Sequence, residues 1–197
     1  MKSEYIDAGA YAVLLRYMTY ENALVLRLCL ETGLRVGDAV KVRREDISGR
    51  VLTFTAEKTG KTGKKRLSAD MARELVRLSG GSGFCFKHRD DPDRHRTRQA
   101  VWRGVRNAAQ RAGQAAHVSP HSARKTYAVG VFQEQGLEAC EKELQHDRVD
   151  TTMLYAFSNL AIGKSTDRIN DKDLVEIIQT GVLNALRVFF GNGKFTD

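Results

Sequence analysis

The sequence has few cysteines and no long apolar segment. No apolar run approaches the ~20 residues of a membrane-spanning helix, so we expect no contact with a membrane. The three cysteines, Cys29, Cys85 and Cys140, are widely spaced and odd in number, which excludes a disulfide scaffold and is typical of a reduced compartment. The N-terminal stretch MKSEYIDAG lacks the apolar core of a signal peptide. We therefore expect a cytoplasmic protein.

Carboxylates are missing from residues 94–133. This segment carries 8 basic side chains and no acidic one, in a chain whose formal net charge is +8. Cations without local counterions suit a polyanion, and nucleic acid is the leading candidate. A basic surface that serves only solubility is the alternative.

The residues that are present predict a mainly helical α+β fold with a small sheet. Hydrophobic residues make up 42% of the 197 residues and charged residues 28%, which is close to the average of a globular domain and excludes disordered and collagen-like chains. Alternating β-formers over 51–56, glycines within 58–64 and a return over 65–68 predict a β-hairpin with a cationic tip. Helices are expected over 11–20, 22–32, 36–42, 69–78, 97–112, from Ser119-Pro120 onward, 138–144, 151–157 and 171–190.

Four segments contain residue types that can handle a phosphodiester. They are TGLRVGD at 32–38, EKTG at 57–60, PHSAR at 120–124, and LQH at 144–146 with Tyr155 nine residues later. In this order they resemble the catalytic domain of the tyrosine recombinase (phage integrase) family, which has TGLR-x-x-E/D, a hairpin lysine often in KTG, H-x-x-R, and LGH followed by a tyrosine. Each motif alone is common, but the ordered set is specific. The resemblance covers about 145 residues.

The resemblance implies DNA strand cleavage and rejoining through a covalent 3′-phosphotyrosyl intermediate, without metal, ATP or another cofactor. Tyr155 would be the nucleophile that attacks the scissile phosphate. Arg35 and Arg124 would bind the non-bridging oxygens, because a guanidinium stays protonated and forms two parallel charge-assisted bonds. Lys58, carried on the hairpin, would be the general acid for the leaving 5′-hydroxyl.

The other positions have broader expected roles. His121 would accept the nucleophile's proton or hold the phosphate, and His146 would donate to a non-bridging oxygen. Asp38 would orient the Arg35 region or a nearby histidine, with an ordinary exposed carboxylate as the alternative. Six cations are expected to contact the DNA backbone, although the hairpin ones also fit a solvated turn: Lys61, Lys64, Lys65, Arg66, Arg98 and Arg103.

Two other kinds of site do not fit. Cys85, His88 and His95 match zinc spacing only loosely and lack a fourth ligand, so we expect no metal. Gly60-Lys61-Thr62 lacks the upstream glycine of a phosphate-binding loop. ATP is therefore not expected.

The sequence also departs from the family pattern. Gln145 stands in place of glycine, Ala123 in place of leucine and Lys125 in place of a common histidine, and the second hairpin strand lacks the usual proline. We expect these changes to affect packing and efficiency more than mechanism.

The resemblance implies a catalytic domain over residues 1–160. A C-terminal extension over 161–197 would carry the helix at 171–190, which packs on its own domain or on a neighbouring protomer. The N-terminal core-binding half of the family's DNA clamp is expected to be absent, since about ten residues precede the first helix. The implied partner is double-stranded DNA, and the chain would be a homotetramer on synapsed DNA and monomeric or weakly associated when free. It would act at the nucleoid and be encoded by a prokaryote, a phage or another mobile element.

Two alternatives remain. A type IB topoisomerase-like strand transferase uses most of the same residue types, and a DNA-binding accessory protein without activity would share the basic segment. A bare binder has no need of Lys58 or Tyr155, which favours an enzyme.

Overall fold

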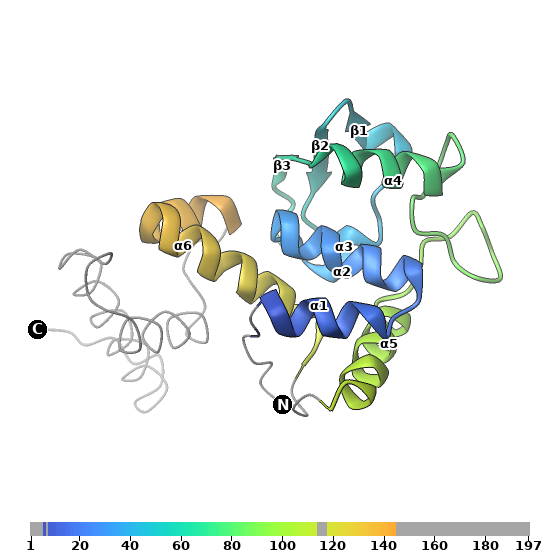
Figure 1. Ribbon diagram of the computed structural model, residues 1–197. Helices are drawn as coiled ribbons and strands as arrows, with labels where there is room; N and C mark the ends of the chain where they lie inside the picture. The colour runs from blue at the N-terminus through green and yellow to red at the C-terminus, as the bar shows by residue number, and fades with distance from the viewer. Residues whose placement is uncertain (1–5, 7, 114–117, 145–197) are drawn as a thin grey trace, which may run out of the picture. The chain divides into compact units, whose positions relative to one another are not determined.

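The computed structural model describes residue 6 and residues 8–113 and 118–144. The chain divides into two units, residues 1–127 and 128–197. Figure 1 shows the elements, most of which belong to the first unit. In chain order they are α1 (Ala8–Arg16), α2 (Tyr20–Thr32), α3 (Val36–Ala39), the 3-10 helix η1 (Arg44–Asp46), β1 (Ile47–Ser48), β2 (Val51–Thr55), β3 (Thr62–Arg66), α4 (Ala69–Ser79), α5 (Arg98–Arg111) and α6 (Pro120–Leu144).

Helix α2 lies at the centre of the first unit. Its apolar residues point to several sides, and Leu24, Val25, Leu26 and Leu28 are all buried. Each such side chain contributes roughly 1.5–3 kcal/mol when it is removed from water. The helix predicted over 22–32 is confirmed, and it is buried on several sides. Helices α3 and α5 pack against it.

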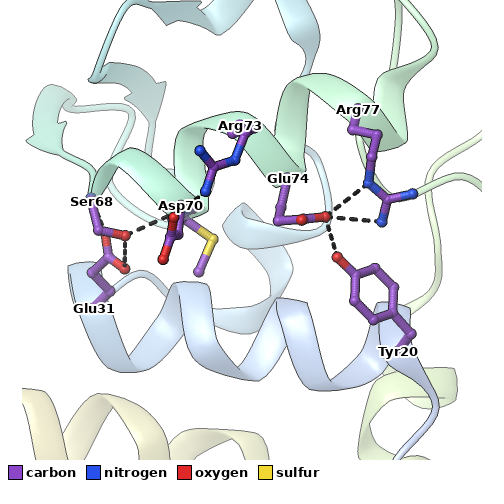
Figure 2. Close-up of polar contacts among 8 residues, drawn as sticks. Tyr20, Glu31, Ser68, Asp70, Arg73, Glu74 and Arg77 are labelled. Atoms are coloured by element: carbon purple, nitrogen blue, oxygen red, sulfur yellow. Dashed lines mark hydrogen bonds and ion pairs between the residues drawn. The ribbon is translucent and has the colours of Figure 1, made fainter.

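Helix α4 runs antiparallel to α2 and is tied to it at both ends (Figure 2). At one end Ser68 caps α4 by accepting a hydrogen bond from the Met71 N–H, while its own hydroxyl donates to Glu31 at 3.0 Å. At the other end the Tyr20 hydroxyl donates to Glu74. These hydrogen bonds hold α4, the helix that follows the sheet, against α2.

The sheet has three antiparallel strands in the order β1-β2-β3. The third strand begins at Thr62, which pairs with Thr55, so the hairpin loop is shorter than the glycine pattern predicted. Only Gly60 lies in the turn, with φ +67°, while Gly63 pairs with Phe54 inside the sheet. The two-residue strand β1 was not predicted.

Helix α6 crosses from the first unit into the second. Gly136 within it has non-helical backbone angles (φ 85°, ψ −177°), which agrees with the prediction of a separate helix over 138–144. The helices predicted over 151–157 and 171–190 lie outside the described residues. Within the described ranges, every helix is too short or too polar to span a bilayer. The mainly helical α+β class is confirmed.

Candidate functional site

A cleft of about 650 Å³ in the first unit brings three of the four predicted motifs together. Its walls come from α3, the β2–β3 loop, the start of α5 and the start of α6. Four of the six predicted catalytic positions line it, together with Asp38: Arg35, Lys58, His121 and Arg124. The remaining two, His146 and Tyr155, lie outside the described residues.

The TGLR segment forms a sharp corner that places Arg35. Helix α2 ends at Gly33, whose φ of 71° is left-handed and suits glycine. The Thr32 hydroxyl donates to the Leu28 carbonyl at 2.6 Å and accepts from the Leu34 N–H at 3.3 Å, which braces the corner. Arg35 then begins α3 from an extended conformation, and its side chain lines the cleft.

Arg124 joins this corner from the other motif. Its side chain is only 4% exposed, and its Nη1 donates to the Gly33 carbonyl. One helical turn later, the ring of Tyr127 packs so closely on Gly33 that a Cβ there would collide with it. The two arginine-bearing segments are therefore locked to each other through one glycine.

Burial also determines the protonation state of the Cys29 thiol, on which the charge of Arg124 acts. Desolvation raises the pKa of Cys29 to about 12, and the positive charge of Arg124 offsets only part of this rise. The thiol is therefore neutral at physiological pH and adds no charge beside the guanidinium. Ala123 and Lys125, two of the positions that depart from the family pattern, flank Arg124 in the sequence. Both are buried.

Asp38 holds the hairpin that carries Lys58. The residue is 7% exposed, and its Oδ1 accepts a hydrogen bond from the Glu57 N–H at 3.0 Å. Lys41, in the turn after α3, forms an ion pair with the Glu57 carboxylate at 3.0 Å. The residue before Lys58 is thus held by its main chain and by its side chain. The sequence predicted the Arg35 region or a histidine as the partner of Asp38, or an exposed carboxylate, whereas the structure shows a buried residue bonded to the hairpin.

His121 stands at the rim of the cleft because of the way α6 begins. Pro120 opens the helix, where its missing N–H is no loss. The His121 N–H donates to the Ser119 hydroxyl at 3.3 Å. His121 is exposed and lines the cleft.

The cleft also contains charged residues that we did not predict as part of it. Lys41, Glu57 and His95 line its wall beside Arg98. Glu57 stands in the EKTG motif, but its ion pair with Lys41 depends on chain topology that the sequence does not display. The pKa of Glu57 is lowered, first by the hydrogen bond and charge of Lys41 and then by the charges of Arg98 and His95.

Cys85, His88 and His95, whose spacing loosely matches a zinc site, do not form a group of metal ligands in the described part of the chain. His95 Nδ1 lies 2.8 Å from the Arg96 carbonyl oxygen, and the ring stacks edge-on against Phe84. Burial raises the pKa of Cys85 to about 12. In the part of the chain that the structure describes, no three His, Cys, Asp or Glu side chains are grouped as metal ligands.

The six cations expected at the DNA backbone are distributed over several surfaces. Arg98 alone among them lines the cleft. Lys64 and Arg66 are exposed on β3, whereas Lys65 points the other way, with its Nζ 3.3 Å from the Tyr127 hydroxyl. Lys61 and Arg103 are exposed on the hairpin loop and on α5.

Comparisons with known proteins agree with the motifs. The model of the Phage integrase family matches residues 5–161. The integrase of Escherichia phage P2 is 28% identical over 152 residues, which are 77% of this chain and 42% of the relative. Tyrosine recombinase XerD of Mycobacterium tuberculosis is 29% identical over 153 residues, 70% of this chain and 48% of the relative. The chain thus spans about half the length of these relatives.

The fold has solved counterparts as well. A crystal structure of a lambda integrase tetramer bound to a Holliday junction superposes with a TM-score of 0.64 at 20% identity, over 86% of this chain and 52% of that one. At 20% identity, this similarity supports a shared fold and nothing further.

Proposed function

Because this chain belongs to the phage integrase family, we propose that it is a site-specific DNA recombinase that cleaves and rejoins strands through a 3′-phosphotyrosyl intermediate. Family membership confirms the resemblance seen in the four motifs. The observation that carries the proposal is the cleft, where Arg35, Lys58, His121 and Arg124 line one cavity although they come from distant segments.

The arginines would bind the scissile phosphate. Arg35 and Arg124 approach the cleft from two elements, so that they can donate to different non-bridging oxygens. A guanidinium keeps its charge at any relevant pH, and charge on these oxygens increases as the pentacoordinate transition state forms. The bond from Arg124 to the Gly33 carbonyl fixes that guanidinium in advance, which reduces the reorganisation needed during the reaction.

The covalent step exchanges one phosphodiester for another. The Tyr155 oxygen attacks phosphorus, its proton goes to His121, and the bond from phosphorus to the 5′-oxygen breaks. Lys58 donates a proton to that leaving oxygen. Attack by a 5′-hydroxyl on the phosphotyrosyl bond reverses the sequence and rejoins a strand. The bonds broken and formed are of the same kind, so the reaction needs no ATP.

The partner that we infer is duplex DNA, held by several copies of the chain. The carboxylate-free segment 94–133 supports a polyanionic partner. The lambda integrase tetramer on a Holliday junction is an assembly in which a protein of this fold works. We propose a homotetramer on synapsed sites, with the tail at 171–190 contacting either its own protomer or a neighbour.

A covalent adduct tests the proposed function. On a nicked suicide duplex that carries the target site, the protein should form a denaturant-resistant protein–DNA adduct. The Tyr155→Phe variant should bind the duplex and form none, because phenylalanine lacks the nucleophilic oxygen. An adduct with the Phe variant would exclude Tyr155, and none with the wild type would favour a binding protein. Strand exchange between two marked duplexes distinguishes a recombinase from a type IB topoisomerase.

A further inference from the structure

A second group of charged side chains lines the cleft beside the predicted catalytic residues. Lys41 lies in the turn after α3, Glu57 in the hairpin loop, His95 in the loop before α5, and Arg98 at the start of α5. Glu57 and Asp38 are the two carboxylates among the residues that line the cleft. Asp38 Oδ1 is engaged by the Glu57 N–H, whereas the Glu57 carboxylate faces cations.

The Glu57 carboxylate contacts one of these cations directly and lies near another. Its Oε1 is 3.0 Å from Lys41 Nζ. Its Oε2 and the Arg98 side chain lie on the same side of Gly37, where a Cβ would come 3.6 Å from Oε2 and 3.2 Å from Arg98 Cδ. Lys41 thus pairs with the Glu57 carboxylate, and the charge of the nearby Arg98 also acts on it. Without DNA, the protein itself supplies the anion beside these two cations.

This contact is weak enough to be exchanged. The Lys41 and Glu57 side chains are 42% and 61% exposed, and water and salt screen exposed ion pairs so strongly that they contribute little to stability. A carboxylate and a phosphodiester each carry one negative charge and accept hydrogen bonds from the same donors. The main chain of Glu57 stays bound to Asp38, so the side chain can turn away while the hairpin remains in place.

We propose that Lys41 and Arg98 form a second phosphate subsite in the cleft, and that Glu57 occupies it until a backbone phosphate of the DNA replaces the carboxylate. The inference rests on the proposed function, since it assumes that DNA enters this cleft. The phosphate bound here would be a neighbour of the scissile one, because Glu57 directly precedes Lys58. Glu57 would then compete with DNA and lower its affinity.

The test compares two ion pairs that differ in their location. Binding of a fluorescein-labelled duplex to the full chain is measured by anisotropy at low salt. Glu57→Gln should bind about 2- to 10-fold more tightly than wild type, since it removes a competing anion. Asp70→Asn is the matched control, because Asp70 is 71% exposed and pairs with Arg73 on α4 (Figure 2). Asp70 is not among the residues that line the cleft. The control variant makes the same change in net charge.

A second pair of variants tests the cations. Lys41→Gln should weaken binding more than Arg73→Gln, and the gain from Glu57→Gln should disappear in a Lys41→Gln, Arg98→Gln background. Equal effects of Glu57→Gln and Asp70→Asn, or a gain that persists without both cations, would overturn the inference while leaving the proposed function intact. Absence of DNA binding by the wild-type chain would overturn both. Thermal melts of each variant identify any loss that comes from unfolding.

Discussion

Lys58 is the residue with the most specific proposed role, since it would protonate the leaving 5′-oxygen. It lies exposed in the hairpin loop and lines the cleft with Arg35. Lys58→Ala should slow cleavage by about 10²–10⁴-fold, the usual contribution of one general acid. Single-turnover cleavage of a suicide duplex measures this rate.

A sulfur substitution separates proton donation from simple charge stabilisation. A bridging 5′-sulfur leaves as a thiolate and needs no proton, so Lys58→Ala should recover most of its rate on that substrate. Arg35→Ala is the control, because its proposed partners are the non-bridging oxygens, which the sulfur leaves unchanged. Equal rescue of both variants, or none for Lys58→Ala, would remove Lys58 from this role.

At the scale of elements, the junction between α2 and α6 depends on Gly33. The residue has a φ of +71°, and the Tyr127 ring occupies the place of a side chain. Gly33→Ala should lower the free energy of unfolding by about 2–4 kcal/mol, because it combines left-handed strain with overpacking. Gly49→Ala is the control, since Gly49 has a φ of +58° with nothing within 4 Å of a Cβ. It should cost about 1–2 kcal/mol in urea unfolding. Equal losses would mean that the Tyr127 contact contributes nothing.

The elements also show which parts of the fold could be predicted from sequence. Helices α2 and α4 were predicted within two residues at each end, because Gly33 and Ser68 mark their limits chemically. Strand β3 was placed three residues late at its start, because it consists of polar and basic residues without an apolar face. Its register comes from main-chain pairing with β2. Periodicity cannot reveal such a strand.

The candidate site was predicted unevenly for a similar reason. Arg35, Lys58, His121 and Arg124 were found because their motifs combine fixed spacing with demanding chemistry, and the structure places all four on one cleft. Lys41 carries no motif. It approaches Glu57 only when the hairpin folds back over the turn after α3. Local sequence patterns cannot predict such a contact between distant segments.

For the whole molecule, the uneven charge distribution predicts how binding responds to salt. The segment 94–133 has 8 basic residues and no acidic one, and further cations lie on the hairpin. A protein that neutralises 6–10 phosphates releases the counterions condensed on the DNA, and this release becomes less favourable as the salt concentration rises. Its affinity therefore falls about 10³–10⁵-fold between 50 and 200 mM salt. Anisotropy titrations at several salt concentrations should show this loss. A flat response would contradict the prediction.

The hydrogen bond between Asp38 and the hairpin has a consequence for how this chain tolerates mutation. Its donor is the main-chain N–H of residue 57, which every amino acid except proline possesses. Substitution of the glutamate by any residue but proline therefore leaves the tether intact, whereas substitution of the aspartate by a residue without a side-chain acceptor, such as alanine, removes it. Asp38 thus anchors the hairpin loop, while the side chain at position 57 contacts the cations of the cleft. The side chain at position 57 can therefore change, and with it the ligand preference of the loop, without detaching the loop from Asp38.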